Sequence, residues 1–403
     1  MKIRKLKIKN YKVFDDVEFD FTDKDGNTLD TVVLAGVNGT GKTTVLEFIF
    51  NCICQPYSKF DEYKDIEAEL TLEIPRNDGF TERIKADILS LRAEVTTKKN
   101  LTFLKLNILD DIQVLFHLIY LGKLAYLPIR QKTDINVDES SSKNYVLHLD
   151  SQWAEMEKSV LKSVQTEVFK NRNLTLNDSI KKSIAKISHV LRGLKLSSKL
   201  VDLDNDSLIF ESANGKRITF ENLSNGEQNL YFRAIQLSHL DIKDGLILID
   251  EPEDALHPTW QKEVAKLYQN VGENNQVIMA THSPHVMASV EPKSLFVLHI
   301  NKESQKIEVI NMEKVGKHTK GLEPNRILRE VMELDMLRDY EVQYKIDELS
   351  KHLTINEFEK IETQELINTL TDTLGKEDPF IIRMEHQLLM LNRQKMKLAD
   401  AVH

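Results

Sequence analysis

Three stretches of the chain are almost continuously apolar, at residues 31–35, 246–249 and 277–280. Short runs of this kind, rich in Val, Ile and Leu, are typical of strands buried on both faces of a parallel sheet. Residues 45–53 instead carry apolar side chains at helical spacing, directly after the first run. The succession of a buried strand, a helix and further buried strands predicts an α/β fold.

A β-hairpin is predicted where the apolar residues 209–210 and 218–220 flank Asn214 and Gly215. An Asn-Gly pair between two apolar runs favours a type I′ turn. The loop after the hairpin is expected to end a strand and open a helix, for which residues 230–240 have the periodicity.

The first strand, within residues 1–21, carries lysine at every second position, at Lys5, Lys7 and Lys9. Alternating lysines protect the exposed edge strand of a sheet from pairing with other chains. We therefore expect a solvated edge strand here. The alternative is a local basic face that binds nucleic acid.

The C-terminal residues predict a helical region. Residues 354–357 form a capping-box sequence that predicts a helix start, and Gly375 is suited to a helix end. Asp378 with Pro379 predicts another start. The apolar face of this last helix holds Met384, Leu388 and Leu391. That face is expected to pack against the rest of the chain, or else to bind a partner protein.

A glycine-rich segment of the pattern G-x-x-x-x-G-K-[ST] lies between the first buried strand and its helix. The backbone N–H groups of such a loop and the N-terminus of the helix point at phosphates. Lys42 is predicted to reach the β- and γ-phosphates of ATP, and the Thr43 hydroxyl to ligate Mg²⁺. The predicted nucleotide-binding residues here are Gly36, Asn38, Gly39, Thr40, Gly41, Lys42, Thr43 and Thr44.

The second apolar run delivers two carboxylates, Asp250 and Glu251, at its C-terminal end. Ligands bind at the carboxyl ends of strands in parallel α/β sheets. Mg²⁺ takes one or two carboxylates, so Asp250 is predicted to hold the ion together with Thr43. Glu251 is predicted to be the general base that polarises the attacking water.

The L-S-x-G-E-Q string at residues 223–228 opens the helix after the hairpin and forms an anion site at its N-terminus. A serine N-cap followed by glutamate is also an ordinary capping arrangement. The string resembles the signature motif of the ABC ATPase superfamily, which lies across a dimer interface on the γ-phosphate of the partner's ATP. The resemblance assigns nucleotide contacts to Ser224, Gly226, Glu227 and Gln228.

The A-T-H-S-P segment at residues 280–284 follows the third apolar run and resembles the H-loop of the same superfamily. The resemblance makes His282 a contact of the γ-phosphate, and it therefore joins Glu251 as a predicted catalytic residue. His257 lies in a segment that resembles the D-loop, and we expect a structural role for it.

Further segments narrow the resemblance to heads of the RecF, SMC and OLD type. Residues 8–14 resemble the first strands of RecF-like and SMC-like heads, and the D-E-P-E-x-x-L-H-P string at 250–258 resembles stand-alone defence ATPases. Residues 321–328 are similar to the C-terminal region of the Septu and retron-associated PtuA-like family. The family implies a homodimer, or a larger even-numbered homo-oligomer, that regulates a nuclease-like effector. A retron reverse transcriptase and its nucleic acid are further implied partners.

The resemblance organises the chain as an ATPase head with a phosphate-loop sheet, an antiparallel subdomain, a helical insertion and a helical tail. The first half of the head is expected at residues 1–134, the insertion at 135–196, the second half at 197–312 and the tail at 313–403. Heads of this class usually place a glutamine near the strand after the first helix. The strand expected at 66–74 has none before it, and Gln55 and Gln131 are the two open substitutes.

Two other functions share parts of this pattern. A DNA-repair ATPase of the RecF type, binding DNA directly, uses the same motifs and is the main alternative. A chain that is its own nuclease, as in the OLD family, requires an acidic catalytic domain, whereas the C-terminal residues have a helical pattern.

Composition limits the partners and the location. The 54 basic and 63 acidic residues give a net charge of −9, which argues against non-specific coating of nucleic acid. Cys52 and Cys54 offer no disulfide framework. The most apolar stretch, residues 114–129, is too short and too interrupted to span a membrane, and no leader precedes the first strand. We expect a cytoplasmic protein without membrane contact.

Overall fold

The computed structural model describes residues 2–54, 67–74, 87–98, 101–107, 124–127, 144–146, 175–204, 207–239, 245–254, 256–334, 338–355 and 358–400. The chain divides into two units, Met1–Ile327 and Leu328–His403, and each is considered by itself. The division falls inside a helix, later in the chain than the expected boundary at 312/313.

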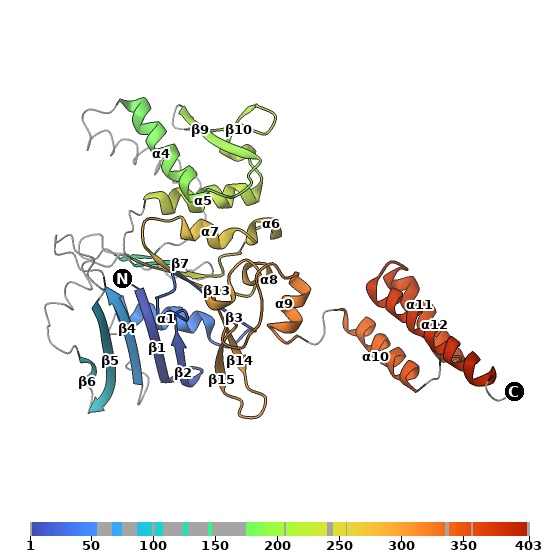
Figure 1. Cartoon of the computed structure of the whole chain (residues 1–403). Coiled ribbons are helices and arrows are strands. Elements are labelled where there is room, and N and C mark those ends of the chain that lie inside the picture. The colour runs from blue at the N-terminus through green and yellow to red at the C-terminus, as the bar shows by residue number, and fades with distance from the viewer. Residues whose placement is uncertain are drawn as a thin grey trace. The chain divides into compact units, whose positions relative to one another are not determined.

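A seven-stranded sheet, of order β15-β14-β3-β13-β12-β7-β8, carries the first unit (Figure 1). Its strands are β3 (Thr31–Gly36), β7 (Leu124–Leu127), β8 (Asn144–Val146), β12 (Leu246–Asp250), β13 (Gln276–Thr281), β14 (Leu295–Ile300) and β15 (Ile307–Asn311). All neighbours pair in parallel except β14 and β15. β3 and β13 are buried along their whole length, so the α/β fold predicted from the apolar runs is confirmed. Because β8 belongs to this sheet, the stretch 135–196 is not purely helical.

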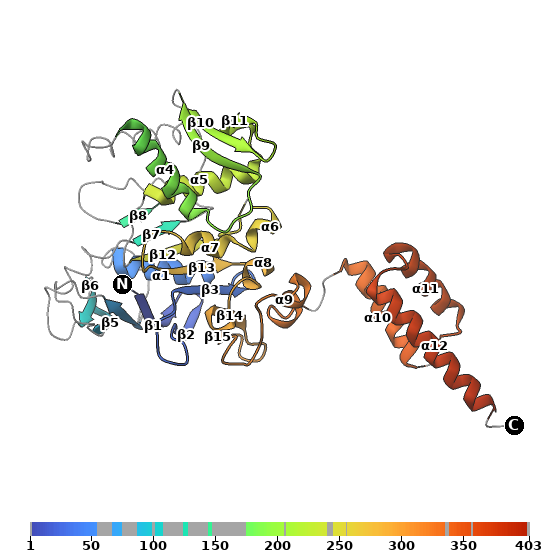
Figure 2. The ribbon, with the colours of Figure 1, turned by 45° about the horizontal axis from the view of Figure 1, so that its top comes forward.

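An antiparallel sheet of order β2-β1-β4-β5-β6 forms the second layer of this unit (Figure 2). Its strands are β1 (Lys2–Tyr11), β2 (Phe14–Asp20), β4 (Glu67–Ile74), β5 (Asp87–Lys98) and β6 (Leu101–Asn107). The expected edge position of the first strand is wrong, since β1 pairs with β2 on one side and with β4 on the other. Lys5, Lys7 and Lys9 alternate because they occupy the solvent-facing side of a central strand.

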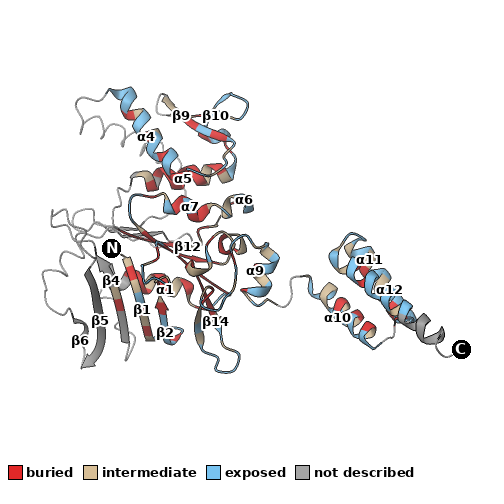
Figure 3. Cartoon of the chain, in the orientation of Figure 1, coloured by how far each residue is buried: buried red, intermediate tan, exposed pale blue. Residues whose placement is uncertain are grey.

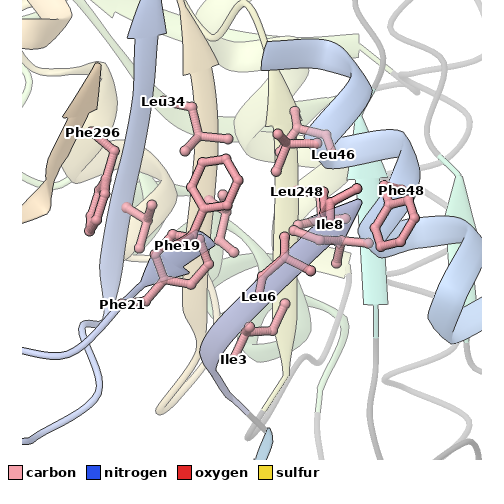
Figure 4. Packing of buried hydrophobic residues seen from close by; sticks show 14 of the residues in the cluster. Ile3, Leu6, Ile8, Phe19, Phe21, Leu34, Leu46, Phe48, Leu248 and Phe296 are labelled. Carbon is pink, nitrogen blue, oxygen red and sulfur yellow. The ribbon is translucent and has the colours of Figure 1, made fainter. Parts of the chain in front are cut away.

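The helix α1 (Lys42–Cys54) packs where the two sheets meet. Its Leu46 and Phe48 share one buried cluster with Ile8 of β1 and Leu248 of β12 (Figure 4). This cluster anchors the helix whose first residue belongs to the phosphate loop. The predicted helix at residues 45–53 is therefore confirmed.

A three-stranded sheet of order β11-β10-β9 lies with two helices in the same unit (Figure 2). The elements are α4 (Leu176–Val190), β9 (Ser198–Asp204), β10 (Ser207–Ser212), β11 (Arg217–Thr219), the 3-10 turn η1 (Phe220–Asn222) and α5 (Asn225–His239). The predicted hairpin is present, but its turn is not of type I′. Only Gly215 has a positive φ, of 77°, and its N–H donates to the Ser212 carbonyl at 2.8 Å. Ser212 N–H donates in turn to the Lys216 carbonyl, so the loop has three residues and ends in a left-handed glycine.

Short helices complete the first unit, and three longer ones make the second. The short ones are α6 (Pro258–Gln261), α7 (Val264–Gln269), α8 (Pro284–Met287), the 3-10 turn η2 (Pro292–Ser294) and α9 (Pro324–Glu330). The second unit contains α10 (Tyr340–Thr354), α11 (Ile361–Leu374) and α12 (Pro379–Asp400). Buried residues gather along these helices (Figure 3). Ile381 and Met384 of α12 belong to the buried cluster of this unit.

Of the helix ends predicted in the second unit, two are confirmed and one is wrong. Gly375 ends α11 with a φ of 81°, and Asp378 caps α12 by accepting the Phe380 N–H at 2.8 Å, as expected. The predicted helix start at residues 354–357 is wrong. Thr354 is the last residue of α10, and its hydroxyl donates to the Ser350 carbonyl, one turn earlier in the same helix, at 2.8 Å. No helix in the part of the chain that the structure describes is long and apolar enough to cross a bilayer.

Candidate nucleotide-binding site

The phosphate loop joins the end of β3 to the start of α1, and two of its glycines are required by close packing. Gly36 has a φ of 147°, and a Cβ on it would overlap the Leu298 carbonyl. Gly41 has a φ of 89°, and a Cβ there would overlap the ring of Phe14. Both positions therefore demand glycine for conformation and for space. Between them, Asn38 and Gly39 are exposed, whereas Thr40 is buried and its hydroxyl donates to the Val37 carbonyl at 2.9 Å.

Lys42 spans this loop with a buried side chain. Its Nζ donates to the carbonyl oxygens of Gly36 and Val37, each at 2.9 Å. Burial lowers the pKa of Lys42 from its ordinary 10.5 to about 8, and the carboxylates of Asp250 and Glu251 offset part of that effect. In the described part of the chain the hydrogen bonds of this cation go to carbonyl groups, and a phosphate oxygen would be a stronger partner for it.

Proton uptake on ATP binding follows from this lowered pKa. A phosphate beside Nζ favours the charged lysine and raises its pKa, so binding near pH 8 should take up roughly half a proton. Above pH 8 the free lysine is neutral, and the affinity for ATP should fall as the pH rises. Calorimetric titration in buffers of different ionisation enthalpy measures the uptake. Binding without uptake between pH 7.5 and 9, roughly one unit around the pKa, would contradict this environment for Lys42.

Thr43 and Asp250 meet although they are far apart in the sequence. The Thr43 hydroxyl donates to the two carboxylate oxygens of Asp250 at 3.1 and 2.9 Å. Burial raises the pKa of Asp250, and the Thr43 hydrogen bond lowers it in part. A half-buried carboxylate beside a hydroxyl is a set of hard oxygen donors of the kind that Mg²⁺ selects, so these two residues fit the predicted ion.

Glu251 directly follows the end of β12 in a left-handed conformation, with a φ of 49°. Such a conformation costs about 1–3 kcal/mol for a residue other than glycine. The neighbouring strand holds it, because the Glu251 N–H donates to the Ala280 carbonyl of β13 at 2.8 Å. The chain therefore turns sharply at this carboxylate, next to Asp250 and beside the strand that leads to His282.

A glutamate that the motifs left without a role joins the acidic loop to the His282 loop. Glu253 Oε1 accepts hydrogen bonds from the Thr281 hydroxyl at 2.7 Å and from the N–H groups of His282 and Ser283, both at 2.9 Å. On the other side of the loop, Ser283 caps α8 and donates its hydroxyl to Gln261 at 2.7 Å. Sequence reasoning missed Glu253, since only the adjacency of β12 and β13 brings it to these donors.

The signature loop is organised by its own glutamate. The Ser224 hydroxyl donates to Glu227 at 3.1 Å and accepts the Glu227 N–H at 3.4 Å, which is the capping arrangement at the start of α5. The buried Glu227 carboxylate also accepts both N–H groups and one hydroxyl from Ser197 and Ser198. Gln228 donates to the Phe220 and Glu221 carbonyls at 3.1 and 3.4 Å. The side chains of Glu227 and Gln228 are thus engaged within the chain, whereas Ser224 is exposed.

Two further residues join the signature helix to the acidic loop. The buried Arg233 of α5 donates to the carbonyls of Pro252 and Asp254, each at 2.5 Å. The ring of Trp260 lies against Gly226 so closely that a Cβ on the glycine would overlap it. Neither Arg233 nor Trp260 belongs to a predicted motif, and no local pattern could have selected them.

The structure therefore gathers Lys42, Thr43, Asp250, Glu251 and His282 at the carboxyl ends of three neighbouring strands. Thr44 lies in the first turn of α1. Within the described part of one chain, no hydrogen bond links Ser224, Gly226, Glu227 or Gln228 to the phosphate loop. His257 caps α6 by accepting the Thr259 N–H at 3.3 Å, which agrees with its expected structural role. Gln55 and Gln131 lie outside the described residues.

Comparison with known proteins gives one family model, described as "AAA domain, putative AbiEii toxin, Type IV TA system", which matches residues 32–288. The Septu protein PtuA of Bacillus thuringiensis is 30% identical over 174 residues, which are 40% of this chain and 43% of that protein. The Retron Vc95 probable ATPase of Vibrio cholerae is 25% identical over 181 residues, 42% of this chain and 34% of that protein. The Septu protein PtuA of Bacillus mycoides is 23% identical over 314 residues, 75% of this chain and 41% of that protein. The chain therefore spans less than half the length of each of these relatives.

Among solved structures, the SMC head domain from Thermotoga maritima aligns with a TM-score of 0.45 and 16% identity, covering 77% of this chain and 99% of that one. An SmcHead bound to the C-winged helix domain of ScpA aligns with a TM-score of 0.47 and 15% identity, covering 78% of this chain and all of that one.

Proposed function

The chain belongs to the family of AAA domains described as putative AbiEii toxins of type IV TA systems, and from that premise we propose that it is an ATPase of anti-phage defence. In this proposal the protein binds ATP with Mg²⁺, hydrolyses it, and forms a homodimer or a larger even-numbered homo-oligomer around it. The ATP state then controls a separate, nuclease-like effector protein. The names of the Septu and retron relatives support the defence role.

One observation carries the proposed activity. The loop cation Lys42, the Thr43–Asp250 pair and the carboxylate of Glu251 converge at one edge of the sheet, with His282 at the end of the adjacent strand. Phosphoryl transfer needs a cation on the phosphates, a metal ion between phosphate oxygens and a group that orients water. Bound Mg²⁺ would supply the neutralising charge, and this chain's residues hold and orient the reactants.

The separation of the signature loop supports the shared site. Ser224 is exposed just before α5, and no hydrogen bond joins it to the phosphate loop within the described part of its own chain. Its hydroxyl donates to the Glu227 carboxylate of the same chain, beside the N-terminal N–H groups of α5, which are donors of the kind that bind anions. A second copy of the chain, bearing ATP on its own phosphate loop, would complete that site.

No observation favours the alternative of direct DNA binding. The lysines that suggested a basic face have acidic neighbours. Lys5 lies 3.7 Å from an oxygen of Asp20, and Lys7 and Lys9 lie 4.0 and 3.9 Å from the carboxylate of Asp16. These pairs reduce the positive potential that phosphate backbones require.

The activity is tested by Glu251→Gln. This variant keeps the size of the side chain and loses the base, so turnover should fall by about 10²–10⁴ while ATP still binds. Steady-state phosphate release and calorimetric ATP binding measure the two effects. Glu291→Gln is the matched control, because Glu291 forms an exposed ion pair with Lys320, away from the motif residues. Turnover of Glu251→Gln at the wild-type rate would remove Glu251 from its assigned role.

The effector is tested by gene context and phage challenge. A nuclease or reverse-transcriptase reading frame beside this one supports the proposal, and the pair should then reduce phage plaquing. A protein that protects no host but binds duplex DNA tightly at moderate salt would favour the repair alternative instead.

A further inference from the structure

In the described part of the chain, one of the two carboxylate oxygens of Glu253 accepts hydrogen bonds and the other does not. Its Oε1 accepts the three hydrogen bonds from residues 281–283, whereas Oε2 is buried and has no hydrogen-bond partner in the described part of the chain. A buried carboxylate oxygen without a partner is costly, and most such oxygens are paired. The carboxylate therefore holds residues 281–283 through a single oxygen. A shorter side chain would move that oxygen away from all three donors together.

The backbone that carries Glu253 is itself fixed. Arg233 donates to the carbonyls of Pro252 and Asp254, the two residues that flank Glu253. The planar guanidinium can engage both carbonyls at once, which a lysine could not do in the same way. Glu253 is thus a short rigid link between the signature helix α5 and the backbone of His282.

We propose that Glu253 is a positioning residue for ATP hydrolysis, which sets the place of His282 by holding the backbone N–H groups of residues 282 and 283. The inference rests on the proposed function, because it takes the role of His282 at the γ-phosphate as its premise. Glu253 contacts no residue of the phosphate loop by hydrogen bond within the described chain. Its positioning effect is therefore expected on turnover, because the hydrogen bonds of Lys42 and Thr43 do not involve it.

The test has to separate the effect of the negative charge of Glu253 from the effect of the length of its side chain. The pKa of Asp250 is raised first by burial and in smaller part by the charge of Glu253, so the glutamate acts on the metal-binding carboxylate as well. Glu253→Gln removes the charge but keeps the length and a carbonyl oxygen for the three donors. Glu253→Asp keeps the charge but shortens the side chain by one C–C bond, about 1.5 Å.

If the length of the Glu253 side chain positions residues 281–283, the glutamine variant should hydrolyse ATP and the aspartate variant should be slow. Glu253→Gln should keep kcat within about threefold of the wild type, whereas Glu253→Asp should lose about 10- to 100-fold in kcat, as expected for a displacement of about 1 Å near reacting atoms. The KM for ATP should be unchanged in both. Glu263→Asp is the matched control, since the Glu263 side chain pairs with the exposed Lys266. The reverse order, with aspartate active and glutamine slow, would overturn the proposal in favour of an effect of charge.

A double variant separates positioning of His282 from general support of the fold. If Glu253 acts through His282, the variant Glu253→Asp/His282→Ala should turn over no more slowly than His282→Ala alone. Losses that multiply would overturn the inference, because a structural defect elsewhere adds to the loss of the imidazole. A slow His282→Ala with a fast Glu253→Asp overturns this inference alone. A His282→Ala variant with wild-type turnover overturns the assigned role of His282 in the proposed function, and the inference with it.

Discussion

We expect the substitution Lys42→Ala to abolish ATP binding. The substitution removes the cation that we predict to contact the β- and γ-phosphates, in a buried environment where the described residues offer it two carbonyl oxygens as hydrogen-bond acceptors. Truncating one partner of a buried, hydrogen-bonded charge pair costs about 2–5 kcal/mol, or roughly 30- to 5,000-fold in the dissociation constant. Isothermal titration of the wild type and the variant with Mg²⁺-ATP measures the difference.

Stability distinguishes a lost site from a damaged fold. Burial disfavours the charged form of Lys42, as its lowered pKa shows, so the nucleotide-free variant should be no less stable than the wild type below pH 8. For a lysine whose pKa is lowered by folding, the burial of its charge destabilises the folded state. This destabilisation is greatest at low pH and disappears as the pH rises past 8 towards 10.5. Lys266→Ala removes an exposed lysine and serves as the control. Unchanged ATP affinity in Lys42→Ala would refute the assignment of this loop.

The elements that carry the site could be predicted because their pattern is local. β3, β12 and β13 are buried, so nearly every position is apolar, and each strand runs directly into a motif residue. The phosphate loop could be predicted as well, because its motif has glycine at Gly36 and Gly41, where the structure leaves no space for a side chain. Strand, loop and helix therefore followed from adjacent residues alone.

What could not be predicted depends on contacts between distant residues. The alternating lysines of β1 fit an edge strand or a central one, and only the pairing with β4 decides between them. The polar sequence at residues 354–357 fits a helix start, but Thr354 completes α10. Glu253 and Arg233 gained their roles from the order of strands in the sheet and from the packing of α5, which no spacing in the sequence encodes.

Ser224→Arg should abolish hydrolysis while leaving ATP bound to each monomer. Lys42 and Thr43 belong to another surface and make no hydrogen bond to Ser224 within the described chain, so binding is retained. An arginine at the exposed start of α5 would fill the space into which the γ-phosphate of the partner's ATP is proposed to fit. The substitution also removes the helix cap, at a cost of about 1 kcal/mol. Ser224→Ala loses the same cap without the bulk and is the matched control for that effect.

Mixing the two inactive variants tests whether the site is shared. In a head-to-tail dimer of one Lys42→Ala chain and one Ser224→Arg chain, one composite site combines both defects. The other combines the intact phosphate loop of the Ser224→Arg chain with the intact signature loop of its partner. With free exchange half of the dimers are mixed, so about a quarter of the wild-type activity should return. A site contained in a single chain gives no recovery, because each chain keeps its own defect. Dimers that demonstrably exchange and stay inactive would contradict independent shared sites, and normal hydrolysis by Ser224→Arg alone would refute the shared site outright.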